Sequence, residues 1–142
     1  MTARTPFATR AREDALNRLG SRDDPRCLSI TDQTILAVSS AQGVIDNGGF
    51  RYFFGADWPG QPPYSFFSDA YRRIGAEMAA TCLDEALDLF PFADPERHGD
   101  LRKEFLGSLP DTHELLALGD RVCGDQAVWE HLEQYAKRQS GH

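Results

Sequence analysis

The sequence predicts an all-α protein, folded as a single-domain helical bundle of about five to seven helices with one irregular loop rich in Gly, Pro and aromatic residues. Three observations support this prediction. Apolar residues recur three and four positions apart in most segments, which is the spacing of one face of an α-helix. Residues that favour helix starts and ends stand between those segments. No part of the chain alternates apolar and polar residues over enough strands to build a sheet.

The first expected helix covers residues 1–20. Its apolar positions lie four residues apart: Phe7, Ala11, Ala15 and Leu19. Residues 20–30 contain Gly, Ser, Asp and Pro, so we expect a connector there. Residues 1–28 are therefore expected to form an arginine-bearing helix and connector, ahead of a main helical domain over residues 29–142.

The second expected helix begins with Thr31 as its N-cap and ends at Asn47–Gly48, since both residues tolerate the left-handed conformation that closes a helix. Its inner positions follow helical spacing: Ile35, Val38, Gln42 and Ile45. The aromatic stretch that follows is expected to form a short helical turn or strand up to Phe54. A loop is expected over residues 55–63, where Gly and Pro are frequent.

A long helix is expected over residues 65–90, ended by Pro91. One broad sector of it is apolar: Met78, Ala79, Cys82, Leu83, Ala86, Leu87 and Phe90. The opposite sector is polar: Glu77, Thr81, Asp84, Glu85 and Asp88. One face is therefore expected in the core, and the other is expected to be an acidic stripe in contact with water.

Three shorter helices are expected after Pro91. Asp94–Pro95 provides an N-cap and a first helical residue for a helix to about Leu106. Asp111 with Glu114 resembles a capping box, which opens a short helix that Gly119 closes. The last helix is defined by an N-cap and its inner positions: Asp125, then Val128, Leu132 and Tyr135.

The net charge of −7 is distributed unevenly along the chain. Residues 1–28 contain six arginines and four acids, whereas residues 77–133 contain fourteen acids and four basic residues. A surface for nucleic acid is therefore not expected on the main body, because carboxylates repel phosphates. An acidic face attracts basic partners, and it also keeps a small protein in solution. Both interpretations of the acids stay open from the sequence alone.

The sequence shows no sign of a membrane or secretory segment. No apolar run approaches the roughly 18 residues of a membrane-spanning helix. The N-terminus contains arginines but lacks the apolar stretch of a secretory signal. The three cysteines are far apart and form no CxxC pair, so neither a disulfide framework nor a zinc site is expected. We expect buried, reduced thiols in a cytoplasmic protein.

Signatures of catalysis are absent from the sequence, which has no nucleophile elbow, no zinc-protease motif and no phosphate-binding glycine loop. Cys123 stands between His113 and His131, so a thiol–imidazole pair is the main enzyme alternative. Asp84 and Asp88 lie one helical turn apart, but a metal site in a bundle requires carboxylates that face inward. We therefore expect a protein that is not an enzyme, with no cofactor and no metal ligand.

The most distinctive segment is Asn47-Gly48-Gly49-Phe50. Consecutive glycines can donate backbone N–H groups to an anion, but Arg51 is the only nearby cation that would support a phosphate site. A structural role fits better. The first two residues close a helix, the second glycine permits a tight reversal, and the aromatic residues after it pack into the core: Phe50, Tyr52, Phe53 and Phe54.

Two stretches of the chain resemble a bacterial family of helical proteins that includes a DNA mimic. The run Val44–Phe53, VIDNGGFRYF, is similar to the family's NGGF signature, and Ala70–Ala76, AYRRIGA, is similar to its IGA segment. The alanine-rich stretch that ends at Pro91 also fits, and the similarity covers roughly residues 30–135. Arg51 stands where the family often has Gln.

The resemblance implies an all-α fold and, for its well-described kind of member, a homodimer whose acidic surface imitates DNA phosphates. Such a mimic occupies the DNA-binding surface of a basic protein, for example a transcription factor. We add a candidate binding face that is not carried over from the family and consists of eight acids: Glu77, Asp84, Glu85, Asp88, Asp94, Glu96, Asp100 and Glu104.

The function expected from the sequence is a non-catalytic protein-binding module that contacts a basic protein, with no direct contact to nucleic acid or membrane. Two alternatives stay open. An immunity or antitoxin-like protein would also neutralise a partner, but specifically a toxin. A small enzyme would use a Cys–His or carboxylate site, which requires those groups to meet in one pocket.

Overall fold

The computed structural model describes residues 4–141, which form seven α-helices and, within those residues, no β-strand. The α-helices have these bounds: α1 Pro6–Leu19, α2 Ile30–Gly55, α3 Ser65–Arg73, α4 Glu77–Leu87, α5 Gly99–Ser108, α6 Glu114–Asp120 and α7 Gln126–Gln139. Short 3-10 helices cover Pro25–Cys27 and Pro95–Arg97. The predicted all-α, single-domain fold is confirmed.

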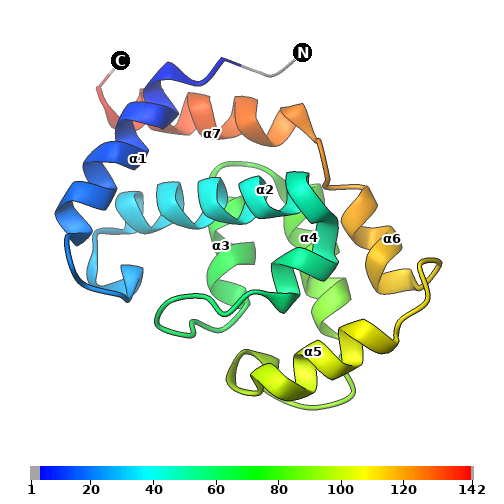
Figure 1. Ribbon diagram of the computed structural model, residues 1–142. Coiled ribbons are helices and arrows are strands. Elements are labelled where there is room, and N and C mark those ends of the chain that lie inside the picture. The colour runs from blue at the N-terminus through cyan, green and yellow to red at the C-terminus, as the bar shows by residue number, and fades with distance from the viewer. Residues whose placement is uncertain (1–3, 142) are drawn as a thin grey trace.

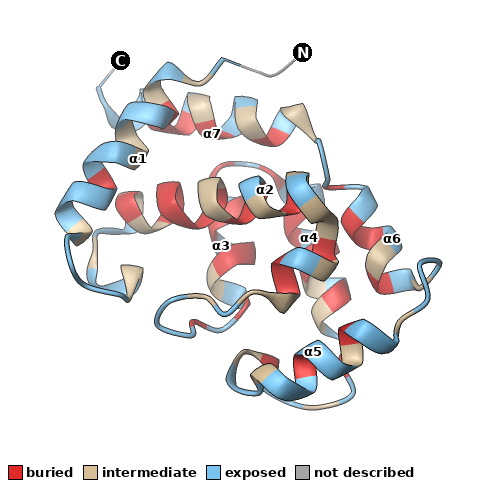
Figure 2. Cartoon of the chain, viewed as in Figure 1, coloured by how far each residue is buried: buried red, intermediate tan, exposed pale blue. Residues whose placement is uncertain are grey.

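Helix α2 lies at the centre of the molecule (Figure 1). It packs against α1, α3, α5, α6 and α7, while α4 lies against α3 and α6. Helices α1 and α7 pack against each other, so the first and the last helix of the chain lie side by side (Figure 1). Figure 2 shows that buried residues concentrate on α2, α3 and α4, whereas α1 and α5 are mostly exposed.

The core contains a cluster of aromatic rings from the second half of α2 and from the start of α3. The rings of Phe53 and Phe67 meet edge to face, with their centroids 5.1 Å apart. The rings of Phe54 and Tyr64 do the same at 4.9 Å. Such pairs contribute beyond the apolar area that they bury. The irregular loop between the two helices covers residues 56–64, close to the predicted range of 55–63.

Helix α1 is held to the rest of the fold by polar contacts as well as by packing. The backbone N–H groups of Phe7 and Ala8 donate to the carboxylate of Glu133 on α7, at 3.1 and 2.7 Å. This carboxylate satisfies N–H groups at the N-terminus of α1, where a helix favours negative charge. At the other end of α1, Arg18 donates to both carboxylate oxygens of Asp32, at 2.6 and 2.8 Å. Helix α1 therefore belongs to the same helical body.

Two glycines interrupt α2. Gly48 has φ −156°, and Gly49 has φ +67° with ψ −159°, so the chain leaves the helical conformation at these two residues and then resumes it up to Gly55. The predicted helix end at Asn47–Gly48 coincides with this break. The following segment, for which a helical turn or a strand was predicted, is helical.

Replacing Gly49 with Ala is expected to lower the free energy of unfolding by about 1–3 kcal/mol, because its backbone angles are essentially restricted to glycine. Gly43 offers a matched control on the same helix, since a Cβ added at either position would meet no atom within 4 Å. Gly43→Ala should instead stabilise by about 0.5–1 kcal/mol, as expected for a regular helical residue. Urea unfolding of both variants tests this, and shifts in the same direction would contradict it.

The predicted single helix over residues 65–90 is wrong, because the chain forms two helices there, separated by residues 74–76. Gly75 has φ +90°, and the N–H of Ala76 donates to the carbonyl of Tyr71 at 2.9 Å, which closes the first helix as a left-handed C-terminal turn does. Both neighbours of Gly75 are buried. The apolar period therefore continues through the turn, and the periodicity does not reveal the break.

Helices α2 and α6 begin at caps other than those predicted. Ser29 caps α2 in place of Thr31, and its hydroxyl accepts from a backbone N–H at 3.1 Å. His113 caps α6 in place of Asp111, since its Nδ1 accepts from a backbone N–H at 3.1 Å. Gly119 does not close this helix. It lies inside α6 and lets α6 approach α2, where an added Cβ would be 2.8 Å from the backbone.

The region after Pro91 also differs from the prediction at one cap. Asp94 adopts a left-handed conformation with φ +51° and makes no side-chain cap, and a 3-10 turn over Pro95–Arg97 precedes α5. Helix α5 therefore begins only at Gly99. The predicted cap of α7 is confirmed, because the carboxylate of Asp125 accepts from a backbone N–H at 3.0 Å. The predicted inner positions of α7 are buried: Val128, Leu132 and Tyr135.

Candidate functional site

The NGGF segment forms the bend of α2. Phe50 and Phe53 are buried, as predicted. Tyr52 is 55% exposed, so the prediction that it packs into the core is wrong. Its ring lies over Gly48, where a Cβ would come within 2.1 Å of the ring atoms. Asn47 is exposed at the surface. The bend is thus fixed by buried rings on one side and by the Tyr52 ring on the other.

A carboxylate beside this bend joins three parts of the chain. Oδ1 of Asp46 accepts from Nε2 of Gln42 and from the backbone N–H of Gly124, both at 2.7 Å. Its Oδ2 accepts from the indole N–H of Trp129 at 2.9 Å. The carboxylate therefore ties α2 to the α6–α7 connection and to α7. Sequence reasoning missed this role, and its only signal was a glutamine at an inner helical position.

Gln42 extends the network into the core, where it is fully buried. Its amide donates to the carbonyl of Val122 at 2.8 Å, and its Oε1 accepts from the hydroxyl of Tyr71 at 2.9 Å. Burial, and then the negative charge of Asp46, raise the pKa of the Tyr71 phenol well above its ordinary value. Tyr71 therefore remains a hydrogen-bond donor at neutral pH. Burial also raises the pKa of Tyr64 to about 12.

The eight acids of the candidate face lie at the surface. Asp84 and Glu96 are half-buried, and the other six are exposed. On α4 the apolar sector faces the core: Ala79, Ala80, Cys82, Leu83 and Ala86 are buried. The carboxylates of this helix therefore point away from the core, and they do not line an internal cavity.

Part of this acidic face is neutralised by an arginine from α3. Arg72 lies 2.6 Å from the carboxylate of Asp84 and 3.6 Å from that of Glu77. Sequence reasoning treated the face as free of cations and missed this residue, because the break at residues 74–76 was not predicted. The remaining acids form no salt bridge within the described part of the chain: Glu85, Asp88, Asp94, Glu96, Asp100 and Glu104.

The two cations of α5 that form salt bridges pair with an acid outside the candidate face. Arg102 and Lys103 lie 2.8 and 2.9 Å from the carboxylate of Asp57. Hydrogen bonds from Lys103 and then Arg102 lower the pKa of Asp57 below its ordinary value. Neither cation therefore neutralises the acids on its own helix.

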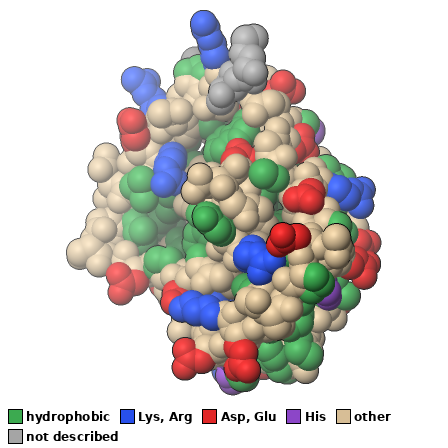
Figure 3. All heavy atoms as spheres, turned by 45° about the vertical axis from the view of Figure 1, so that its right-hand side comes forward, with side chains coloured by type: hydrophobic (Ala, Val, Ile, Leu, Met, Phe, Trp, Pro, Cys, Tyr) green, Lys and Arg blue, Asp and Glu red, His purple; other side chains and the backbone are tan. Residues whose placement is uncertain are grey.

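Three acids of the face line a common groove. The groove has a volume of about 350 Å³, and its acidic residues are Asp88, Asp94 and Glu96. Its apolar lining comes from Tyr64, Leu87, Phe90 and Phe92, among others. On the face in Figure 3, Asp and Glu side chains stand in small groups, with basic and neutral side chains between them. The acids thus gather locally and do not cover that whole face.

The groups required by the enzyme alternative are thiols, imidazoles and carboxylates that meet in one place. Cys82 is buried, but Cys27 and Cys123 are exposed, so the prediction of three buried thiols is wrong. The Cys123 thiol donates to the backbone carbonyl of Asp46 at 3.6 Å. Across residues 4–141, no group of three or more His, Cys, Asp and Glu could hold a metal ion. None of the helices in that range is long and apolar enough to cross a membrane.

The fold and the site together define a class: a small all-helical protein whose central helix is broken by two glycines and whose candidate site is a surface of carboxylates. Residues 26–139 match the family described as DMP19-like protein, and the chain belongs to this family. The predicted family resemblance is thereby confirmed. No curated protein and no solved structure matches the chain. The family match begins at residue 26, so α1 lies outside it.

Proposed function

We propose that this protein is a non-catalytic binding module whose acidic face covers the DNA-binding surface of a basic protein, as a mimic of DNA. The main support is a set of six outward carboxylates without a salt bridge among the described residues: Glu85, Asp88, Asp94, Glu96, Asp100 and Glu104. Membership of the DMP19-like family agrees with this role.

The spacing of these carboxylates suits contact with the basic surface by which a partner protein binds DNA phosphates. A helix rises about 1.5 Å per residue, so Asp100 and Glu104, the one pair of the six that lies four residues apart on a single α-helix, are about 6 Å apart along the axis of α5. Lysines and arginines that bind DNA phosphates can bind such a pair. Association through it would be fast and sensitive to salt, because it is guided by long-range charge.

The proposal can be tested by capture of partners on the tagged, full-length chain. We expect wild type to retain a DNA-binding protein from extracts of its native cell, and we expect duplex DNA or raised salt to release it. Glu85→Gln with Asp88→Asn should weaken this capture roughly tenfold or more. Both residues are exposed and unpaired, so their change should not disturb folding.

A matched control removes the same amount of charge elsewhere. Glu13→Gln with Asp14→Asn also deletes two carboxylates, from exposed positions on α1. This variant should capture the partner as wild type does. Equal loss in both variants would assign the effect to overall charge. Unchanged capture by the Glu85 and Asp88 variant, or a partner that DNA does not displace, would contradict the proposal.

Two further parts of the proposal follow from the resemblance and from the cysteines. We expect a homodimer in solution, which sedimentation velocity would detect. We also expect the interaction to occur in the cytoplasm, where free thiols such as those of Cys27 and Cys123 remain reduced.

A further inference from the structure

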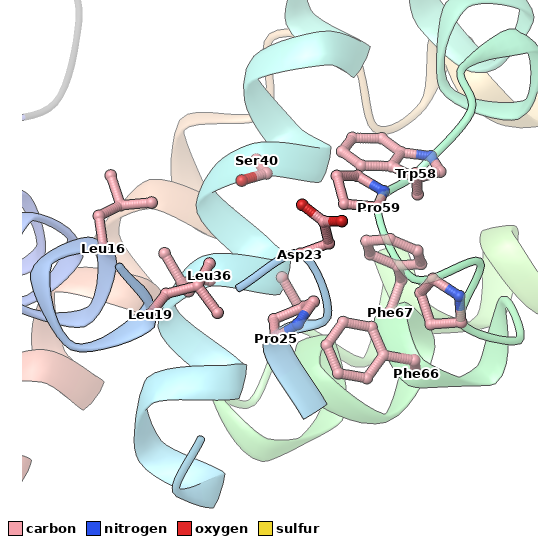
Figure 4. Close-up of a pocket in the computed structure, with 12 residues that line it drawn as sticks. Leu16, Leu19, Asp23, Pro25, Leu36, Ser40, Trp58, Pro59, Phe66 and Phe67 are labelled. Carbon is pink, nitrogen blue, oxygen red and sulfur yellow. The ribbon is translucent and has the colours of Figure 1, made fainter. Parts of the chain in front are cut away.

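An apolar groove lies between α1, α2 and the loop that leads to α3 (Figure 4). Its volume is about 230 Å³. Its walls are almost entirely apolar, with Leu16 and Leu19 from α1, Leu36 from α2, Trp58 from the loop and Phe66 from α3. Leu16 is 43% exposed, so part of its apolar surface at the groove is open to solvent.

One wall of this groove belongs to the part of the chain that the family match does not cover. Leu16, Leu19, Asp23 and Pro25 all precede residue 26, where that match begins. The opposite wall comes from residues within the match. The groove therefore forms only because α1 packs onto the part of the chain that matches the family. Its shape depends on residues outside the match as well as on residues within it.

The groove contains a single ionisable side chain among its lining residues, Asp23. In Figure 4 its carboxylate lies between Ser40 and Pro59. Asp23 forms no salt bridge with any described residue, whereas the adjacent Asp24 is paired with Arg26 at 2.8 Å. An apolar groove with one unpaired carboxylate is complementary to an apolar group that has a positive charge beside it.

We infer that this groove binds one apolar side chain of a partner protein, on a segment that places Lys or Arg beside that side chain. The volume favours a single side chain, because small-molecule sites usually measure about 300–1,000 Å³. An apolar anchor seated in a pocket is a common way for a partner segment to bind, and a nearby charge then fixes its orientation. The positive residue pairs with Asp23.

This inference does not depend on the acidic face. Its apolar part is argued from the groove walls, and its charge preference is argued from Asp23. The groove would add a second contact surface to the protein, and the Glu85 and Asp88 variant should leave it intact.

Selection from a phage-displayed library of random 12-residue peptides tests the inference. Wild type should enrich peptides that contain a large apolar residue with Lys or Arg within four positions. Asp23→Lys should enrich peptides with the same apolar residue but with Asp or Glu in place of the base. Leu16→Glu should bind the peptides selected by wild type at least tenfold more weakly. Leu16 and Asp23 are both exposed, so the variants should fold, and circular dichroism would verify this.

The two tryptophans locate the bound peptide within the protein. Trp58 lines the groove and donates its indole N–H to the carbonyl of Phe53 at 3.0 Å. Trp129 does not line the groove and donates to Asp46. In ¹⁵N-labelled protein, an enriched peptide should shift the indole resonance of Trp58 and leave that of Trp129 in place.

Several outcomes would overturn the inference. One is that the selection enriches no peptide, or only peptides that Leu16→Glu binds as tightly as wild type does. Another is selection of the same charges by wild type and Asp23→Lys, which would leave only an apolar contact. A third is a peptide that shifts Trp129 and not Trp58. A fourth is a dimer that Leu16→Glu converts to monomer, which would make a second copy of the chain the occupant. The Glu85 and Asp88 variant should select the wild-type peptides, so failure here is separable from failure of the proposed DNA mimicry.

Discussion

Replacing Arg102 with Met is expected to lower the free energy of unfolding by about 3–5 kcal/mol. Arg102 is charged but only 2% exposed. Its guanidinium donates to the carbonyls of Pro95 and Phe54, at 2.7 and 2.9 Å, and to Oδ1 of Asp57 at 2.8 Å. Methionine fills much of the same space but donates no hydrogen bond. Each buried carbonyl would lose its bond to a charged donor and keep one other partner, the Tyr64 hydroxyl at 3.4 Å for Phe54 and the His98 N–H at 3.1 Å for Pro95.

The same change should also weaken the proposed acidic face. Arg102 fixes the turn over Pro95–Arg97 against the end of α2, and this turn positions Asp94 and Glu96 beside the groove. Urea unfolding followed by circular dichroism measures the stability. Lys103→Met is the control, because its amine contacts the same Asp57 from an exposed position and should matter little. Equal unfolding midpoints for the two variants would show that the buried network does not hold the turn.

Much of the fold follows from local patterns in the sequence. The glycine break in α2, the Asp125 cap and the inner positions of α7 are all readable from residue type and spacing. The break at Gly75 is not, because apolar residues on both sides of it keep the helical period. Arg102 could not be predicted either. An arginine on a polar helix is normally solvated, and its burial depends on carbonyls that only the tertiary fold brings together.

In the candidate site too, some features follow from local sequence patterns and others depend on the tertiary fold. The outward direction of the α4 carboxylates follows from the phase of its apolar residues. Their partial neutralisation by Arg72 does not, since it requires α3 and α4 to fold against each other at the Gly75 turn. The apolar groove also depends on distant segments, because Leu16 and Trp58 line one groove only when α1 packs on α2. The sequence therefore predicts which side chains of a helix face water better than it predicts which residues from other helices lie beside them.

Asp46→Ala should be the second most damaging change, with an expected loss of about 2–4 kcal/mol in the free energy of unfolding. The alanine would leave three N–H groups without their acceptor: one N–H of the Gln42 amide, whose nitrogen still donates to Val122, the backbone N–H of Gly124 and the indole N–H of Trp129. Gln42 is fully buried and cannot turn to water, so its cost is the largest of the three. The damage should spread along the network to Tyr71, whose hydroxyl depends on a fixed Gln42.

Asn47→Ala is the matched control for this prediction, because it changes the adjacent, exposed residue of the same helix and should alter stability by about 0.5 kcal/mol or less. Asp46→Asn adds a finer test. The Asn47-adjacent amide of this variant keeps one oxygen for Gln42 and Gly124 but turns its NH₂ group toward the indole donor of Trp129. The loss in the free energy of unfolding should therefore be intermediate, and the Trp129 indole resonance should move. If Asp46→Ala is no more harmful than Asn47→Ala, the bend of α2 is held by its aromatic rings alone, and the carboxylate network contributes nothing to it.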